Sequence, residues 1–106
     1  MEKKWFVRDR DGREIYLTEE QWKHIVTRHP ELRNHLEEVL KTVQQGRRRQ
    51  QPKDPQAYIY RLACNTLPPP FNGILVVVVF RFEDKEMTPN NFIVTAWGIM
   101  MRKRGY

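Results

Sequence analysis

The segment that decides the fold is residues 22–32, which read WKHIVTRHPEL. It carries a tryptophan, two of the three histidines and a His-Pro step that is followed by a carboxylate. Proline disfavours the helical conformation at the residue before it, so a helix that contains Trp22 should end or bend at His29. Pro30 itself suits the first position of a new helix. The sequence therefore predicts two consecutive helices with His29 at the elbow between them.

A helix start signal lies just before this segment. Thr18 can accept a hydrogen bond from the backbone of Gln21, and the Gln21 side chain can reach back, which is the pattern of a capping box. Helical spacing places four residues on one buried face: Trp22, Ile25, Val26 and His29. His24 and Arg28 point away from that face.

The second helix is predicted from an apolar stripe after the elbow. The stripe consists of Leu32, Leu36, Val39, Leu40 and Val43. Gly46 is a natural end, because glycine readily adopts the conformation that closes a helix. Asn34 followed by Glu37 is a competing start signal, so the helix begins at Pro30 or about one turn later.

Strands are predicted on both sides of the helices. An Asp-Gly turn joins residues 4–8 to residues 14–17 in a hairpin at the edge of the sheet. Three further strands are expected at residues 57–64, 74–82 and 92–99. The middle one reads ILVVVVFRF, and its nearly continuous apolar sequence places it centrally in the sheet. Residues 47–56 are polar and basic with two prolines, and we expect a mobile loop there.

The order of elements predicts an α+β fold in which two consecutive helices pack on one face of a small, mostly antiparallel sheet. A chain of 106 residues fits one domain, with an edge hairpin at residues 1–17 and a basic tail at residues 99–106. No apolar run approaches the roughly 20 residues that span a bilayer, and none resembles a signal peptide. We therefore expect an intracellular, cytoplasmic protein without membrane contact. Cys64 is the single cysteine, so no intrachain disulfide can form, and no spacing predicts a metal or other cofactor.

The formal net charge is +6, and basic residues cluster in two blocks. One block is Arg47, Arg48 and Arg49; the other is Arg102, Lys103 and Arg104. Such blocks favour phosphate-bearing partners and make binding sensitive to salt. Each block alone could be a solvated loop or a frayed tail, but two blocks on a small chain favour a nucleic-acid partner.

Polar residues inside apolar strands need an explanation, because a buried polar group without a partner costs about 1–3 kcal/mol. Three residues are of this kind: Arg61, Arg81 and Thr95. If the last hairpin pairs Phe80 with Val94, then Arg81, Thr95 and Trp97 share one face. The same register places four residues under the helices: Phe80, Phe82, Phe92 and Val94. A slip of one residue would destroy this arrangement.

A basic face with aromatic rings suits single-stranded RNA, since arginines can bind phosphates and rings can stack on bases. The rings in question are Tyr60, Trp97 and Tyr106. Ordinary explanations stay open, namely that the rings pack in the core or at an edge. Arg61 and Arg81 could likewise form salt bridges or extend along a sheet edge.

Cleavage of RNA without a metal needs a base for the 2′-hydroxyl, an acid for the leaving oxygen, and cations near the phosphorus. Histidine suits both proton roles because its pKa lies near neutrality. His24 and His29, with Glu31 beside them, could supply these groups together with Arg61 and Arg81. Two alternatives remain open: His29 could be a core residue or a helix cap, and His24 an ordinary exposed histidine.

Several stretches of the chain resemble phage-associated nucleases of the barnase–EndoU–colicin–RelE-like (BECR) families. The resemblance covers residues 22–97, and its most specific parts are His24-Ile25, His29-Pro30-Glu31 and Thr95-Ala96. It implies helices on one face of a small antiparallel sheet, with a metal-independent ribonuclease site on or beside the other face. It also implies catalytic roles for His24, His29, Arg61 and Thr95. Members often act as toxins, which implies an acidic antitoxin or immunity protein as a partner.

The leading hypothesis is therefore a toxin-type endoribonuclease that forms a 2′,3′-cyclic phosphate without a metal. The catalytic set is His24, His29, Arg61 and Thr95, and the nucleic-acid-binding set is Arg81, Trp97 and the two basic blocks. Two alternatives are a non-catalytic nucleic-acid-binding module and a protein–protein interaction domain with an acidic partner. The enzyme hypothesis requires the elbow histidines and the strand arginines to reach a common hollow. Helices that bury His29 against the opposite face of the sheet would prevent this.

Overall fold

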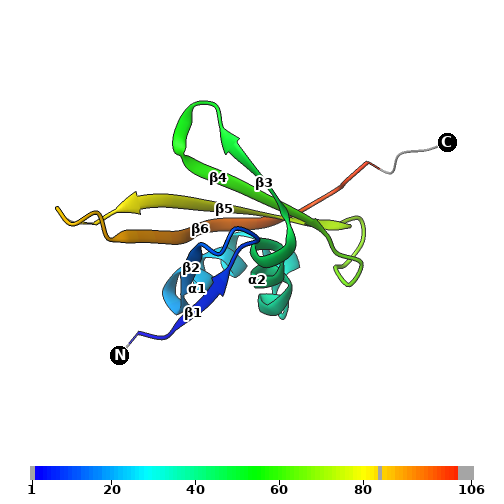
Figure 1. Cartoon of the computed structure of the whole chain (residues 1–106). Coiled ribbons are helices and arrows are strands. Elements are labelled where there is room, and N and C mark those ends of the chain that lie inside the picture. Colours follow the sequence, from blue (N-terminus) through cyan, green and yellow to red (C-terminus); the bar gives the residue numbers. More distant parts are fainter. Residues whose placement is uncertain (1, 84, 103–106) are drawn as a thin grey trace.

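A computed structural model describes residues 2–83 and 85–102 of the chain (Figure 1). The described part contains two α-helices, a short 3-10 helix and six strands. Along the chain these are β1 (Lys4–Arg8), β2 (Glu14–Thr18), α1 (Glu19–Arg28), η1 (Pro30–Leu32), α2 (Leu36–Gln45), β3 (Arg47–Gln51), β4 (Asp54–Ala63), β5 (Gly73–Phe82) and β6 (Pro89–Ile99). The predicted α+β fold is confirmed.

The strands form one sheet in the order β1-β2-β6-β5-β4-β3. Neighbours pair antiparallel except β2 and β6, which pair in parallel with Tyr16 opposite Phe92. The helices connect β2 to β3 and thereby carry the chain from one side of the sheet to the other (Figure 1). The apolar strand β5 lies between β4 and β6, inside the sheet as its composition predicts.

The core lies between the helices and one face of the sheet. Helix α2 packs against β4 and β5, and α1 packs against β6. Fully buried core residues include Ile25, Val39, Val43, Ile74, Val76, Val78, Ile93 and Ala96. We call the opposite, helix-free side of the sheet the open face. Because side chains alternate along a strand, Leu75, Val77 and Val79 lie on the open face, next to buried neighbours that face the helices.

The helix ends follow their sequence signals with two differences. Thr18 caps α1 by accepting the backbone N–H of Gln21 at 3.0 Å, whereas the Gln21 side chain does not complete a capping box and instead donates to the carbonyl of Val94. The residues after His29 form the short helix η1, so α2 begins at the later of the two predicted starts. Gly46 ends α2, and a Cβ there would lie 2.8 Å from the carbonyl oxygen of Arg61, so the close approach of β4 requires glycine.

The prediction of a mobile loop at residues 47–56 is wrong, because this segment forms β3, a turn and the start of β4. Its polar composition resembles a loop, but the edge of β4 offers backbone partners from Arg47 opposite Arg61 to Gln50 opposite Tyr58. Side chains add to the pairing, since the Arg48 guanidinium lies 4.6 Å from the Tyr58 ring. An edge strand with charged side chains is also protected from pairing with other chains.

The hairpin of β5 and β6 does not pair Phe80 with Val94. Phe80 lies opposite Asn91, Val78 opposite Ile93, and Val77 opposite Thr95, so Val94 is an extra residue in β6. This β-bulge reverses the alternation of side chains along β6. Consequently Ile93 faces the core, while Thr95 faces the open side.

The bulge has two consequences for the predicted faces. Arg81, Thr95 and Trp97 do share the open face. Thr95 pairs with Val77 and Trp97 pairs with Leu75, and both partners lie on the same side of β5 as Arg81. Of the residues expected under the helices, Phe80 packs against the core, whereas Phe82 is exposed and Phe92 belongs to the open face. That part of the prediction is wrong because it assumed an uninterrupted strand.

Candidate active site

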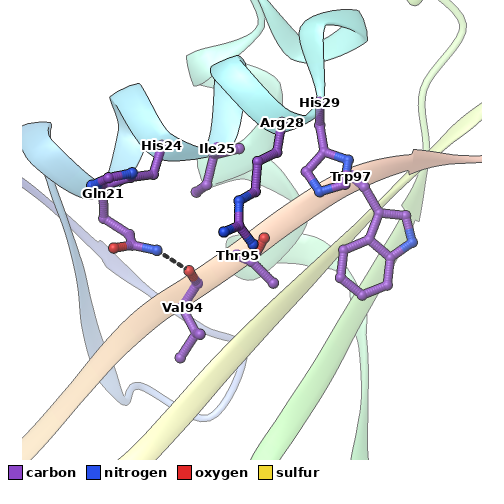
Figure 2. A pocket seen from close by; sticks show the side chains of 8 residues that line it. All are labelled: Gln21, His24, Ile25, Arg28, His29, Val94, Thr95 and Trp97. Carbon is purple, nitrogen blue, oxygen red and sulfur yellow. Dashed lines mark hydrogen bonds between the residues drawn. The ribbon is translucent and has the colours of Figure 1, made fainter.

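A hollow of about 720 Å³ lies between α1 and β6 (Figure 2). Its lining combines imidazole, guanidinium, amide, hydroxyl and indole groups: Gln21, His24, Ile25, Arg28, His29, Val94, Thr95 and Trp97. We call it the α1–β6 hollow. It brings together His24, His29, Thr95 and Trp97, which sequence reasoning had selected from two distant segments of the chain.

Helix α1 supplies one wall through residues on one side. Gln21, His24 and Arg28 are three and four positions apart, so they lie on the same side of the helix. Ile25 is 1% exposed and anchors this side to the core. The Gln21 side chain donates to the carbonyl of Val94, the bulged residue, and so ties the first half of the helix to β6.

The elbow anchors the other end of α1. His29 leaves the helical conformation with φ −129° and ψ 73°, as the following proline requires, while its N–H still donates to the carbonyl of Ile25 at 2.7 Å. Its ring lies 5.9 Å from the Trp97 ring, and 31% of its side chain remains exposed. His29 is therefore neither sealed in the core nor freely solvated.

Glu31 joins the elbow to the edge of β6. One oxygen, Oε2, accepts the backbone N–H of Gly98 at 2.8 Å and lies 3.9 Å from Nδ1 of His29. A Cβ at residue 98 would lie 2.9 Å from both Glu31 and Phe71, so this contact requires glycine. The carboxylate thus satisfies a strand-edge donor and stands beside the imidazole at the same time.

The edge of β6 is accessible to the elbow because β2 meets β6 at Phe92 and then diverges into α1. Beyond the Tyr16–Phe92 pair that joins β6 to β2, this edge is hydrogen-bonded at Val94 by Gln21 and at Gly98 by Glu31. The elbow therefore projects the imidazole of His29 past the sheet edge toward the open face. This geometry removes the obstacle that burial of His29 under the helices would have created.

Arg28 lies between His24 and His29 in Figure 2, and its side chain extends from α1 toward Thr95 on β6. Sequence reasoning had placed Arg28 and His24 away from the apolar face but gave Arg28 no role. The spacing of Gln21, His24 and Arg28 was the signal that could have found it, since residues at i, i+3 and i+7 share one side of a helix. Arg28 is the cation that the structure adds to the predicted set.

Arg61 does not line this hollow. The register places Arg47, Arg61, Leu75 and Trp97 in one row across four strands on the open face. Arg61 is two strands from Trp97, which corresponds to about 10 Å between backbones. It instead lines a second hollow of about 610 Å³ with β3, together with Arg47, Arg49 and Ile59.

The remaining predicted cations fall in different places. Arg81 and Arg49 are exposed on the open face, with Arg49 in the same row as Thr95. Arg48 alternates to the other side of β3, where it contacts Tyr58 and lies 3.5 Å from Asp11. Arg102 is exposed, and Lys103 and Arg104 lie outside the described residues.

Tyr60 is buried, and His35 is largely buried. Tyr60, considered as a ring for stacking on RNA, is 1% exposed and donates from its hydroxyl to Asp9 at 2.6 Å. Its burial favours the alternative that it is a core residue. His35 is largely buried at the start of α2, with Nδ1 3.7 Å from Glu38. Tyr106 lies outside the described residues.

No known protein family, curated protein or solved structure matches this chain. Within residues 2–83 and 85–102, no group of three or more His, Cys, Asp or Glu side chains is placed to hold a metal ion. None of the helices in those ranges is both long and apolar enough to cross a membrane.

Proposed function

We propose that this protein is a metal-independent endoribonuclease and that the α1–β6 hollow is its active site. The observation that carries the proposal is that His24, His29 and Arg28 line one solvent-open hollow. Two proton-transfer groups and a cation are what cleavage of an RNA phosphodiester needs. The resemblance of residues 22–32 to the BECR nucleases points the same way.

The proposed reaction uses the 2′-hydroxyl of the substrate as the nucleophile. A base removes the hydroxyl proton, and the 2′-oxygen attacks the adjacent phosphorus. The bond from phosphorus to the 5′-oxygen breaks, and an acid gives that oxygen a proton. The products are a 2′,3′-cyclic phosphate and a 5′-hydroxyl end.

We assign His29 as the base and His24 as the acid. The Glu31 carboxylate near Nδ1 of His29 favours the tautomer with its proton on that nitrogen, which leaves Nε2 free to accept a proton. The contact with Trp97 further restricts the ring. His24, exposed on α1, is free to exchange its proton with solvent between turnovers.

Arg28 is assigned to the reacting phosphate, because its side chain extends toward Thr95 between the two histidines (Figure 2). A guanidinium can stabilise the charge that develops on the phosphoryl oxygens. Thr95 offers a hydroxyl to the same group. Arg61, Arg49 and Arg81, which lie farther along the open face, are assigned to neighbouring phosphates.

RNA is the proposed partner, and the net charge of +6 would favour its approach. The same charge suits a small acidic protein as an inhibitor. We therefore include an antitoxin-like partner in the proposal, in line with the resemblance to toxin nucleases.

The test is cleavage of end-labelled RNA in EDTA by the wild type and by His24→Ala, His29→Ala and Arg28→Ala. We expect a loss of about 10²–10⁴-fold for each histidine variant, which is the usual contribution of a proton-transfer group. Lys23→Ala is the matched control, because it removes a cation from the same helix outside the hollow. The wild type should leave 2′,3′-cyclic phosphate ends and should not cut a DNA strand of the same sequence.

Three results would contradict the proposal. The first is cleavage that both histidine variants retain. The second is equal cleavage of the DNA strand, which has no 2′-hydroxyl. The third is salt-sensitive RNA binding by the pure wild-type protein without any product, which would instead identify a non-catalytic binding module.

A further inference from the structure

Three aromatic side chains form a row across three strands of the open face. The register places Phe6 opposite Tyr16 on β1 and β2, and Tyr16 opposite Phe92 on β2 and β6. The ring centres are 6.1 Å apart for the first pair and 6.0 Å for the second. We call this set the aromatic row. Phe6 is 60% exposed, so the row ends in a phenyl ring that the fold leaves in contact with water.

The aromatic row is accompanied by cations. The ammonium of Lys4 lies 4.7 Å from the centre of the Tyr16 ring, and the guanidinium of Arg81 lies 5.7 Å from that of Phe92. Both residues are exposed. Rings interleaved with cations at solvent are the arrangement by which sheets bind single strands, because each base can stack on a ring while each phosphate meets a charge.

The aromatic row is continuous with the α1–β6 hollow. A smaller hollow of about 380 Å³ is lined by Tyr16, Phe92 and Arg81, and it shares Gln21 and Val94 with the α1–β6 hollow. Phe92 and Thr95 both face the open side of β6, and because of the bulge their partners on β5, Val79 and Val77, are only two residues apart, which corresponds to about 7 Å along a strand. A chain that lies on the row can therefore continue directly to the histidines.

We propose that the aromatic row is a base-stacking platform that binds single-stranded RNA next to the cleavage site. The inference rests on RNA being the ligand of the proposed function, and it adds the form of the substrate: unpaired, and extending several nucleotides beyond the scissile phosphate. A duplex would fit poorly, because its bases are already stacked on one another and its surface presents backbone rather than ring faces.

The experiment measures binding of a fluorescein-labelled 12-nucleotide 2′-O-methyl oligouridine by anisotropy. Methylation of the 2′-oxygen removes the nucleophile, so binding is measured without cleavage. Phe6→Ala should weaken binding roughly five- to 150-fold, the usual range for loss of one base–ring stack. Because phenylalanine carries no charge, the dependence of affinity on salt should keep the wild-type slope.

Phe82→Ala is the matched control. Phe82 is 61% exposed, as Phe6 is, but it follows Arg81 in β5 and therefore lies on the other side of the sheet. Phe82→Ala should bind like the wild type, and Phe6→Trp, which keeps a ring, should restore affinity. Circular dichroism of all variants checks that each is folded.

The proposal is overturned if Phe6→Ala and Phe82→Ala bind alike, or if a duplex of the same length competes as well as the single strand. It is also overturned if the wild type fails to bind the oligonucleotide at low salt. These outcomes are independent of catalysis. Binding that depends on Phe6 without RNA cleavage would contradict the proposed nuclease activity and support the stacking platform. RNA cleavage without binding that depends on Phe6 would support the nuclease activity and contradict the platform.

Discussion

Replacing Tyr60 by phenylalanine should lower the free energy of unfolding by about 2 kcal/mol at neutral pH. The Tyr60 hydroxyl donates to Oδ2 of Asp9 at 2.6 Å, and both residues are buried. Hydrogen bonds to charged groups contribute about 1.5–3 kcal/mol each. The other oxygen of Asp9 keeps the backbone N–H groups of Asp11 and Arg13, so the carboxylate is not left without partners. The expected cost is therefore near the middle of that range.

The effect should depend on pH in a specific way. Burial raises the pKa of Asp9, but the Tyr60 hydroxyl, two backbone N–H groups and the charge of Arg13 outweigh it, so the pKa lies below the usual 3.8. A lowered pKa in the folded state contributes stability that is present above about pH 4 and is lost as the pH falls further. Protonation of Asp9 should thus shrink the difference between the wild type and Tyr60→Phe in acid.

The alkaline side has the opposite sign. Burial, followed by the hydrogen bond to Asp9, raises the pKa of Tyr60 well above its usual 10.0. A raised pKa in the folded state contributes stability that is complete below the usual value and is lost as the pH rises above it. Tyr60→Phe has no such loss. The difference between the two proteins should therefore form a plateau from about pH 4 to pH 10 and decline on both sides.

Urea unfolding followed by tryptophan fluorescence at a series of pH values measures this difference. By thermal unfolding, it corresponds to a lower Tm by roughly 4–8 °C per kcal/mol. Tyr58→Phe, two residues along β4, is the control and should change stability by less than about 0.5 kcal/mol. A difference below 0.5 kcal/mol for Tyr60→Phe, or one that stays constant from pH 3 to pH 11, would refute the role assigned to the Asp9–Tyr60 pair.

Two further predictions test the supports of the α1–β6 hollow. Ile93→Ala should lower the free energy of unfolding in urea by about 2–5 kcal/mol, because Ile93 is buried. Val94→Ala, at the half-buried bulge, should lower it by less than about 1.5 kcal/mol. Equal losses would mean that the strand is not bulged there. Gly98→Ala should lower RNA cleavage about tenfold and stability by about 1–3 kcal/mol, because its Cβ would displace Glu31. Gly12→Ala is the control: residue 12 has φ +80° and open space around it, so the substitution should lower stability by about 1 kcal/mol without affecting cleavage. A similar loss of cleavage in both variants would mean that lower stability alone explains the effect of Gly98→Ala.

Much of the site could be inferred from local chemistry. The His-Pro step determined that the helix ends at His29, and Thr18 determined where it begins, so the segment that carries His24 and His29 was placed correctly. The apolar pattern of α1 identifies only the buried side of the helix, and Arg28 lies outside that pattern. Arg61 was grouped with the histidines as a polar residue in an apolar strand and through the resemblance. Its row in the sheet depends on the pairing of four strands, which no local signal reveals.

The sequence by itself determined the helices, their elbow and the apolar strand β5, because proline geometry, helix capping and side-chain periodicity act over a few neighbouring residues. Only the tertiary structure decided which way β6 presents its side chains. One extra residue, Val94, reverses the alternation along β6, buries Ile93 and turns Thr95 and Trp97 toward the histidines. At the bulge, the side chain of Gln21 on α1 donates to the carbonyl of Val94. The consecutive residues Val77 and Val78 of β5 pair with Thr95 and Ile93 on either side of Val94. The Gln21–Val94 contact joins residues 73 positions apart, so no local pattern in β6 could predict it.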